Sequence, residues 1–399
     1  MKKSLLFVSI IIFLFTAGIL CKNIFAQQKL FNVASRLDIK ENNCFNQSYN
    51  QLSDSLIAVW DSIFQANGIK DEPFAMMLYL IEWFNQMSSE ETTGYHSIAK
   101  ISSTGKTNLR SSILAVCAIM QKFGWDILCF YNEDECYLGL ALDETWKIRK
   151  ANWVEKNNKN YYLKEFDTVT PVGELKIDNP ASKYRSIKAK KENLNPIPII
   201  RKMPVFGDPV FEKVLKWYYK NMEYNTTVSI PKAQIEWTQN LPPSLYGMTN
   251  PGIIELKRIG LVDRLKIMLN NFQEYDRVNF LLKFCQSESI FIYDSKQQIQ
   301  SVSKQLTEGY NDCDGRSIFL YCLLRAVLDY SDEDIIFLSW PNHLALGLRP
   351  KTEEAVKILE ENDGYSVNDK FYILDPTYLG NTGWGSKMKR LSNDCEIIE

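Results

Sequence analysis

Apolar residues recur at helical spacing in two separate segments of the chain, and each segment begins with polar residues. The first is Asn108–Met120 (NLRSSILAVCAIM) and the second is Cys313–Arg325 (CDGRSIFLYCLLR). With an offset of 313 − 108 = 205 residues, a serine, an isoleucine and a cysteine fall at matching places in both. Apolar positions with this period after a polar start are typical of a buried helix. We therefore predict one buried helix in each segment.

Each predicted helix is followed by three short runs that are rich in β-branched and aromatic residues and are bounded by turn residues. Such runs are typical of β-strands. They are Trp125–Asn132, Tyr137–Leu142 and Lys159–Phe166 in the first half of the chain, and Glu333–Trp340, Leu344–Leu348 and Asp369–Pro376 in the second. The pattern predicts an α+β fold in which a helix packs on antiparallel strands. The nearly constant offset favours two tandem copies that arose by duplication.

The segment between the two copies is charged and contains prolines, which is typical of a linker. It spans Lys188–Pro204. After it, we predict a helix around Trp217–Met222 (WYYKNM), an extended segment over Asn225–Trp237 and a helix over Asp276–Gln286. The predicted domains are therefore residues 27–190 and residues 191–399.

Composition limits the classes of function. The 399 residues are 45% hydrophobic, which is enough for two domains that each have a core. The formal net charge is -2, and the sequence has no basic block and no stripe of alternating basic and aromatic residues. We therefore expect no nucleic-acid partner.

The N-terminus has the pattern of a secretory signal peptide. Lys2 and Lys3 precede an apolar run, and Ala26 stands at a suitable cleavage point. The run from Leu5 to Leu20 is slightly short for a membrane span, which disfavours an uncleaved anchor. We expect residues 1–26 to be removed. The mature chain would then lie outside the cytoplasm, in the periplasm, at the cell envelope or secreted, with no stable membrane span.

Metal and cofactor chemistry has little support in the sequence. The chain has only two histidines, His96 and His343, and no CxxC or HxxxH pattern. Its nine cysteines have no regular spacing, so the chain does not resemble a disulfide scaffold. We expect no metal site and no cofactor.

Three residues of the second copy could form a nucleophilic site. Cys313 stands at the start of a predicted helix, where the helix terminus favours the reactive thiolate. His343 opens one predicted strand and Asp375 ends the next, at separations of 343 − 313 = 30 and 375 − 343 = 32 residues. A base oriented by a carboxylate completes such a site. We therefore predict Cys313 as the nucleophile, His343 as the base and Asp375 as the orienting group.

Each of these residues also has an ordinary structural explanation when it is taken alone. A cysteine before an apolar helix is usually a core thiol, and an aspartate before a proline is usually a turn residue. The order of all three favours the catalytic interpretation. At the matching positions, the first copy has Asn108, then Glu135 or Cys136 depending on the gap, then Glu165. It has no thiol at its helix start, so it cannot perform the same chemistry.

The second copy resembles the transglutaminase-like superfamily, which has a papain-like fold. The resemblance rests on NDCDGRS, then PNHLALGL, then GYSVNDKFYILDPTY, in that order along the chain. It is similar to secreted members found in Bacteroides-type bacteria, and the first copy looks like a degenerate relative. The resemblance implies the same triad, Cys313, His343 and Asp375.

Three further residues are candidates for contact with the substrate. Tyr310 could help to hold the oxyanion or could serve in packing, and Asn342 could line the substrate groove or close a turn. Trp384, in a glycine-flanked loop, could form a wall of the site or a surface connection. For the turn that includes Asn342, the turn interpretation is favoured.

The expected activity is acyl transfer from a peptide or side-chain amide. Water as acceptor gives a cysteine peptidase or amidase, and an amine gives a transglutaminase. The acyl donor stays open between a protein glutamine, a peptide bond and a cell-envelope peptide. The alternative is a secreted, non-catalytic binding or scaffolding protein on a papain-like fold. A third candidate is an enzyme controlled by oxidation of Cys313.

Overall fold

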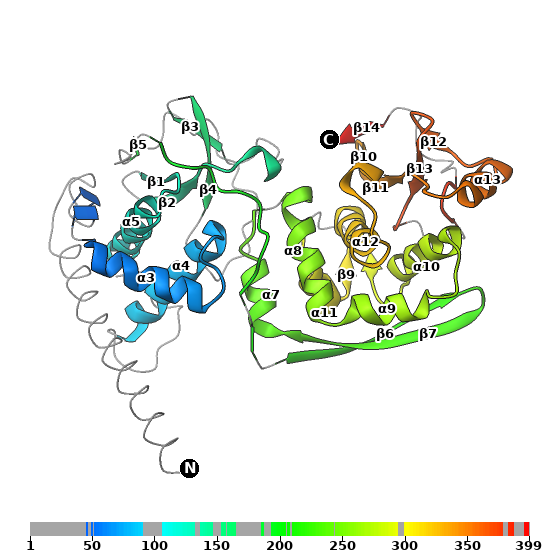
Figure 1. Ribbon diagram of the computed structural model, residues 1–399, viewed down its shortest axis with the longest axis horizontal. Coiled ribbons are helices and arrows are strands. Elements are labelled where there is room, and N and C mark those ends of the chain that lie inside the picture. The colour runs from blue at the N-terminus through cyan, green and yellow to red at the C-terminus, as the bar shows by residue number, and fades with distance from the viewer. Residues whose placement is uncertain are drawn as a thin grey trace, which may run out of the picture. The chain divides into compact units, whose positions relative to one another are not determined.

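The computed structural model divides into two compact units. Unit 1 comprises Met1–Asp143 with Lys150–Pro198, and unit 2 comprises Glu144–Arg149 with Ile199–Glu399 (Figure 1). The structure describes residues 45–46, 49–50, 52–90, 106–131, 136–146, 153–156, 158–164, 185–186, 193–204, 206–207, 210–242, 244–293, 299–377, 382–386 and 395–398. The predicted signal peptide, residues 1–26, lies outside these ranges.

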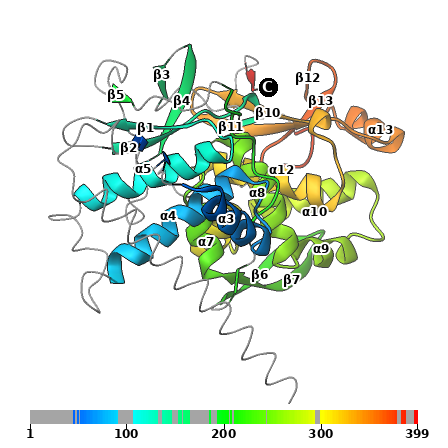
Figure 2. The same cartoon turned by 60° about the vertical axis from the view of Figure 1, so that its left-hand side comes forward.

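Unit 1 consists of helices packed on one antiparallel sheet. Its helices are α3 (Asp54–Ala66), α4 (Pro73–Glu90) and α5 (Lys106–Lys122). Its strands are β1 (Ile127–Tyr131), β2 (Cys136–Leu140), β3 (Trp153–Lys156), β4 (Lys159–Lys164) and β5 (Arg185–Ser186). Helix α5 contacts α4 on one side and β1 and β2 on the other (Figure 2). The described core residues of α5, from Ile113 to Met120, are all buried, as their helical spacing predicts.

Unit 2 contains a second antiparallel sheet. Its strands are β10 (Ile335–Trp340), β11 (His343–Leu348), β12 (Ser366–Val367), β13 (Phe371–Leu374) and β14 (Glu396–Ile398). The order of strands is β12-β13-β11-β10-β14, and that of unit 1 is β3-β4-β2-β1-β5. The two orders match strand for strand when β1 is set against β10. The fold is therefore mixed α+β with antiparallel sheets, and the predicted class is confirmed at this level.

The register of the two sheets also matches at a glycine. Gly139 on β2 faces Leu128 and Leu163, and Gly347 on β11 faces Ile336 and Ile373. A Cβ atom at Gly139 would lie 2.2 Å from the ring of Phe130, and one at Gly347 would lie 2.8 Å from the side chain of Ile336. Glycine inside a strand often marks such a close approach.

The helices of unit 2 are α7 (Lys232–Thr238), α8 (Leu245–Arg258), α9 (Leu261–Met268), α10 (Glu274–Gln286), α11 (Val302–Glu308), α12 (Cys313–Val327) and α13 (Glu353–Glu361). Several of them, among them α9, α10 and α12, lie between this sheet and a long hairpin, whereas α13 lies beside β12 and β13 (Figures 1 and 2). Helix α12 packs against α8, α9, α10 and β11. Because it is surrounded on several sides, its residues from Gly315 to Leu324 are all buried.

The prediction of a helix at WYYKNM is wrong, because this segment forms part of a β-hairpin. Strand β6 (Val210–Tyr219) pairs with β7 (Met222–Pro231) along its whole length. Trp217 and Tyr219 are buried and Tyr218 is exposed, which is the two-residue period of a strand. Lys220 and Asn221 both have positive φ, at 49° and 64°, and form a tight two-residue turn. The extended segment expected over Asn225–Trp237 ends at Pro231, where α7 begins.

The segment predicted as a linker is attached to unit 1 for part of its length. Asn195 makes a bridge with Trp125, and Ile197 makes a bridge with Leu142. Backbone hydrogen bonds of 2.8 Å join Asn195 to Gly124 in one direction and Asp126 to Asn195 in the other. Two further strands are very short and parallel, β8 (Ile292–Tyr293) and β9 (Tyr310–Asn311). The second of these leads directly into the start of α12.

Candidate active site

Cys313 is the first residue of α12, and the side chain of Asp312 caps this helix. The Asp312 carboxylate accepts a hydrogen bond of 2.9 Å from the backbone N–H of Gly315, as an N-cap residue should. Cys313 itself is partly exposed, and its Sγ lies 3.6 Å from Oδ1 of Asp314. By contrast, Cys285 and Cys322 are fully buried. Cys313 is therefore a thiol at a helix start that a small molecule can reach.

The start of α12 is held by a tight fit between a glycine and a buried amide. A Cβ atom at Gly315 would lie 1.8 Å from Oδ1 of Asn311. Asn311 is fixed there, because its Nδ2 donates to Gln305 at 2.6 Å and its Oδ1 accepts from the N–H of Asp312 at 3.0 Å. The glycine of the CDG motif therefore allows strand β9 to approach the helix that carries the thiol.

His343 is the first residue of β11 and follows a two-residue turn. The turn is formed by Pro341 and Asn342, and it pairs His343 with Trp340 across the hairpin. Nε2 of His343 lies 2.8 Å from Oδ2 of Asp375. This contact occupies one ring nitrogen, so Nδ1 is the nitrogen left for the contact with Cys313. Cys313 lies close enough to the ring to help raise the pKa of His343.

Asp375 follows the end of β13, and several donors hold it in place. The N–H and the hydroxyl of Thr377 both donate to its Oδ1, at 2.8 and 2.6 Å. Nε2 of Gln286, at the end of α10, donates to its backbone carbonyl at 2.8 Å. Burial opposes the charged form, but the hydrogen bond and charge of His343 and the bonds from Thr377 lower the pKa of Asp375. The carboxylate is therefore ionised and directed at the histidine.

The protonation of His343 follows from its two neighbours. Burial of the ring favours the neutral form, but the hydrogen bond and charge of Asp375, together with the neighbouring Cys313, raise the pKa of His343 to about 9. The imidazolium is therefore the main form at neutral pH. An imidazolium beside a thiol favours the thiolate, which is the nucleophilic form of cysteine.

Two buried side chains join the helix of Cys313 to its surroundings. The hydroxyl of Ser317 donates to the carbonyl of Leu344 at 3.2 Å, which ties α12 to β11. The guanidinium of Arg316 is 1% exposed and donates to the carbonyls of Phe291 and Cys285, at 2.8 and 3.4 Å. The first contact ties α12 to the strand that begins with His343, and the contact with Cys285 ties it to α10.

The structure brings the three predicted triad residues together. Of the three other candidates, two lie next to triad residues along the chain and one lies beside a different cavity. Tyr310 is 49% exposed on β9, three residues before Cys313. Asn342 is exposed in the turn beside His343. Trp384 is buried and stacks on Tyr275, with ring centroids 6.1 Å apart, beside a cavity that no triad residue lines. Tyr310 and Asn342 thus remain candidates for contact with the substrate, and Trp384 belongs to a different site.

Sequence reasoning missed the residues that support the triad. Thr377 follows Asp375 by two residues, and an aspartate that bonds to the residue two positions on is a known turn signal. This contact could have been predicted from the DPT stretch. Gln286 lies 89 residues before Asp375, and no local signal indicates the bond between them.

The described residues contain no group of three or more His, Cys, Asp or Glu side chains that could hold a metal ion. Within the same ranges, no helix has both the length and the apolar character that crossing a membrane requires. No family model, curated protein or solved structure matches the chain. Any functional conclusion therefore depends on the residues and their geometry.

Proposed function

We propose that this chain is a thiol-dependent acyl-transfer enzyme of the transglutaminase-like type. The observation that carries the proposal is the position of His343, which bonds to Asp375 at 2.8 Å and lies near enough to Cys313 for that side chain to affect its pKa. These three side chains come from α12, β11 and the end of β13, which lie up to 62 residues apart in sequence, as 375 − 313 shows. Nucleophile, base and orienting group in contact are the parts that acyl transfer by a thiol needs.

The chemistry proceeds in two halves. The thiolate of Cys313 attacks an amide carbonyl carbon, and the Nδ1–H of the His343 imidazolium protonates the leaving amine. A thioester on Cys313 and a neutral imidazole result. Water or an amine then attacks the thioester while Nδ1 accepts its proton, and the thiolate leaves as the imidazolium forms again. Asp375 keeps its charge throughout and stabilises the imidazolium.

The oxyanion that forms during each attack lies close to the start of α12. The first backbone N–H groups of a helix have no partner within the helix. The N–H of Cys313 is one of these, and the positive end of the helix dipole adds to it. Tyr310 is the candidate for a second donor because its side chain is exposed just before Cys313.

Hydrolysis is the default reaction because water is abundant at a partly exposed thiol, and an amine acceptor would give a crosslink instead. The substrate we propose is a protein or peptide amide, with a cell-envelope peptide as one candidate. The signal-peptide pattern of residues 1–26 supports a site of action outside the cytoplasm.

We further propose that both units have a papain-like core and that they arose as tandem copies. The shared order of strands and the paired glycines, Gly139 and Gly347, support this. The offset between these glycines is 347 − 139 = 208. Counting back by 208 from His343 reaches Glu135, which lies outside the described residues. Unit 1 would then be a degenerate copy with no histidine at this position.

The test is site-resolved alkylation of the full chain by iodoacetamide between pH 5 and 9, read by peptide mass spectrometry. We expect Cys313 to react at least about 100-fold faster at pH 6 than an ordinary exposed thiol, because its neighbour is an imidazolium. His343→Ala should remove this advantage. Cys285 and Cys322 serve as internal controls and should stay unmodified because they are buried.

A slow reaction at Cys313 that does not depend on His343 would overturn the catalytic proposal, provided the thiol is shown to be reduced. A non-catalytic binding protein would then be the better account of the fold. Thiol counting with and without reductant separates that outcome from oxidation of Cys313.

A further inference from the structure

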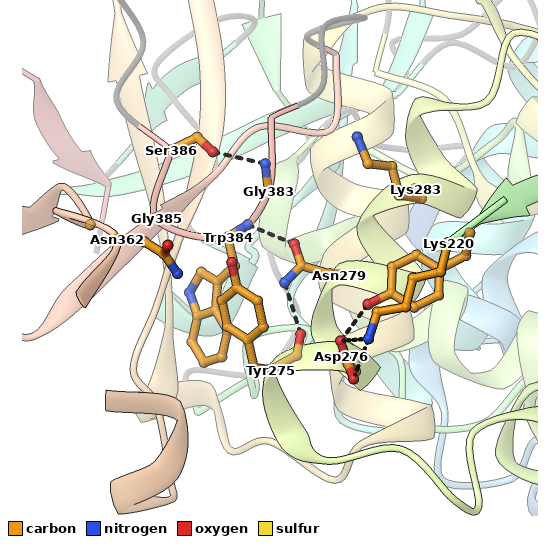
Figure 3. A pocket seen from close by; sticks show the side chains of 12 residues that line it. Lys220, Tyr275, Asp276, Asn279, Lys283, Asn362, Gly383, Trp384, Gly385 and Ser386 are labelled. Carbon is orange, nitrogen blue, oxygen red and sulfur yellow. Dashed lines mark hydrogen bonds and ion pairs between the residues drawn. The ribbon is translucent and has the colours of Figure 1, made fainter. Parts of the chain in front are cut away.

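A cavity of about 440 Å³ opens in unit 2 beside α10, and no residue of the triad lines it. Its walls include Lys220, Tyr275, Lys283, Trp384 and Ser386 (Figure 3). The volume falls within the range of roughly 300–1,000 Å³ that is usual for small-ligand sites. The cavity is large enough to hold a few residues of a peptide.

The two lysines of this cavity differ in their partners. The ammonium of Lys220 lies 2.8 Å from a carboxylate oxygen of Asp276, and Figure 3 shows the two side chains directed at one another. Lys283 donates to the carbonyl of Thr382 at 3.2 Å, and no carboxylate of the described residues pairs with it. An ammonium has three donors, so Lys283 keeps donors for a ligand. Its half-buried position, which lowers its pKa, also means that an anion beside it would be poorly screened by water.

One wall of the cavity is flat and aromatic. The rings of Tyr275 and Trp384 are stacked with an interplanar angle of 19°. Asn279 holds both residues, because it donates to the carbonyl of Tyr275 at 2.9 Å and accepts from the N–H of Trp384 at 2.8 Å. Trp384 is 2% exposed, and its indole N–H has no hydrogen-bond partner among the described residues. A buried donor without a partner is unfavourable, so this N–H lowers the stability of the protein.

The cavity and the triad share one support. Lys283 and Gln286 are neighbours on α10, and both bond to Thr382 at the edge of the cavity. Gln286 also donates to the carbonyl of Asp375 at 2.8 Å. A ligand bound against Lys283 is therefore held by the same helix that positions the orienting carboxylate.

We propose that this cavity binds a free carboxylate of the peptide substrate through the ammonium of Lys283, with the adjacent residue of the peptide against Tyr275. The inference rests on the proposed function, and it narrows the substrate to peptides with a free C-terminal or side-chain carboxylate. A single ammonium suits a monoanion, whereas phosphate groups are usually bound by several cations.

The experiment measures binding and not turnover, so it uses the full chain with Cys313→Ala. Two probes are titrated by calorimetry, acetyl-Ala-Ala-Tyr with a free carboxylate and the same peptide as an amide. We expect the acid to bind about tenfold more tightly, which is the size of one charge-assisted hydrogen bond. Adding Lys283→Met should bring the two affinities within about twofold.

The matched control is Lys357→Met. Lys357 is an exposed lysine on α13 that pairs with Glu361, so this change removes the same charge from outside the cavity. It should leave the tenfold preference intact. Trp384→Phe keeps the stacked ring and removes only an N–H that has no accessible surface, so it should also leave the tenfold preference intact.

Equal affinity of the two peptides would overturn the inference. A preference for the acid that survives Lys283→Met would also overturn it. If the melting temperature of that variant falls as well, Lys283 serves only to hold the backbone at Thr382. These outcomes do not depend on alkylation of Cys313. A carboxylate preference together with an unreactive Cys313 would support the binding site and reject the proposed catalysis, so the two proposals can fail separately.

Discussion

The sheets of unit 1 and unit 2 have the same order of strands, but their buried carboxylates have different partners. In unit 1, Asp126 precedes β1 and bonds to Lys159 at 2.6 Å and to Tyr161 at 3.1 Å. In unit 2, Asp375 follows β13 and bonds to His343 at 2.8 Å. The partner in unit 2 is an imidazole whose pKa is raised to about 9, so it is both charged at neutral pH and able to give up its proton during a reaction.

The comparison distinguishes the residues that stabilise the fold from the residues that could perform chemistry. The buried glycines and the apolar strand faces occur in both sheets, and they require only close packing. The thiol, the imidazole and its carboxylate occur together in unit 2, at the ends of the elements and not in their middles. Chemistry can therefore be lost or gained at element ends while the core stays intact.

The largest expected effect comes from Asp375→Asn. Without the carboxylate, burial would lower the pKa of His343 from about 9 toward or below its usual 6.5, so the imidazolium would be lost at neutral pH. We expect the alkylation rate of Cys313 at pH 7.5 to fall about 10- to 100-fold. The rate profile between pH 5 and 9, measured by mass spectrometry, checks this.

The control for Asp375→Asn is Asp126→Asn in unit 1. It removes a buried carboxylate from the other sheet and breaks the bond to Lys159. The stability of unit 1 should fall and the reactivity of Cys313 should not change. An equal loss of reactivity in both variants would mean that the effect comes from general unfolding.

A second difference between the units concerns pH and stability. Glu255 on α8 is fully buried, and burial raises its pKa to about 7 although Ser303 donates to it. The folded chain therefore binds more protons than the unfolded chain between pH 4.5 and 7, so stability falls as pH rises through this window. The expected loss is up to about 3 kcal/mol.

Glu255→Gln should remove this dependence, so the variant should gain stability over the natural chain as pH rises from 5 to 8. The stability of each unit is measured by titrating the protein with denaturant and following hydrogen exchange in peptides from that unit. The gain should appear in unit 2 and not in unit 1. A pH-independent difference would show that Glu255 does not titrate in this range.

The paired glycines provide a symmetrical test of the two units. Gly139→Ala places a methyl group against the ring of Phe130, and Gly347→Ala places one against Ile336. Each change should destabilise its own unit by about 1–3 kcal/mol. Hydrogen exchange resolved by unit should show one region affected in each variant, and a loss spread evenly over both would contradict this.

The smallest expected effect comes from Asp314→Asn. The carboxylate of Asp314 lies 3.6 Å from Sγ of Cys313, so it places a negative charge beside the atom that attacks the reagent. Removing this negative charge should raise the alkylation rate at pH 6 about threefold. An unchanged or lower rate would mean that the charge of Asp314 is screened by water.

The helices and strands around the triad could be predicted because their signals are local. The apolar period marks α12, and the β-branched and aromatic runs mark β10, β11 and β13. The β6–β7 hairpin was missed because its turn is Lys220–Asn221 and contains no glycine, so aromatic residues were read as a helix. The alternation of buried Trp217, exposed Tyr218 and buried Tyr219 is visible only in the structure, because all three residues are aromatic.

The triad could be proposed from order and spacing, but its supports could not. The bond between Gln286 and Asp375 depends on how α10 packs beside the sheet, which no short pattern encodes. The same holds for the cavity, where Asn279 contacts Trp384, 105 residues further along the chain. From sequence, Trp384 is a candidate either for a wall of the triad site or for a surface connection, because no local pattern places its loop against α10.

The close contact between Gly315 and Asn311 affects how a mutational scan of this protein should be interpreted. Any residue larger than glycine at position 315 would clash with the amide of Asn311, which two hydrogen bonds hold in place. In a library of all single substitutions selected for function, position 315 would be as intolerant as Cys313. Such a screen would rank a residue that has no reactive group among the essential ones, because the space it leaves empty lets the nucleophile reach its place.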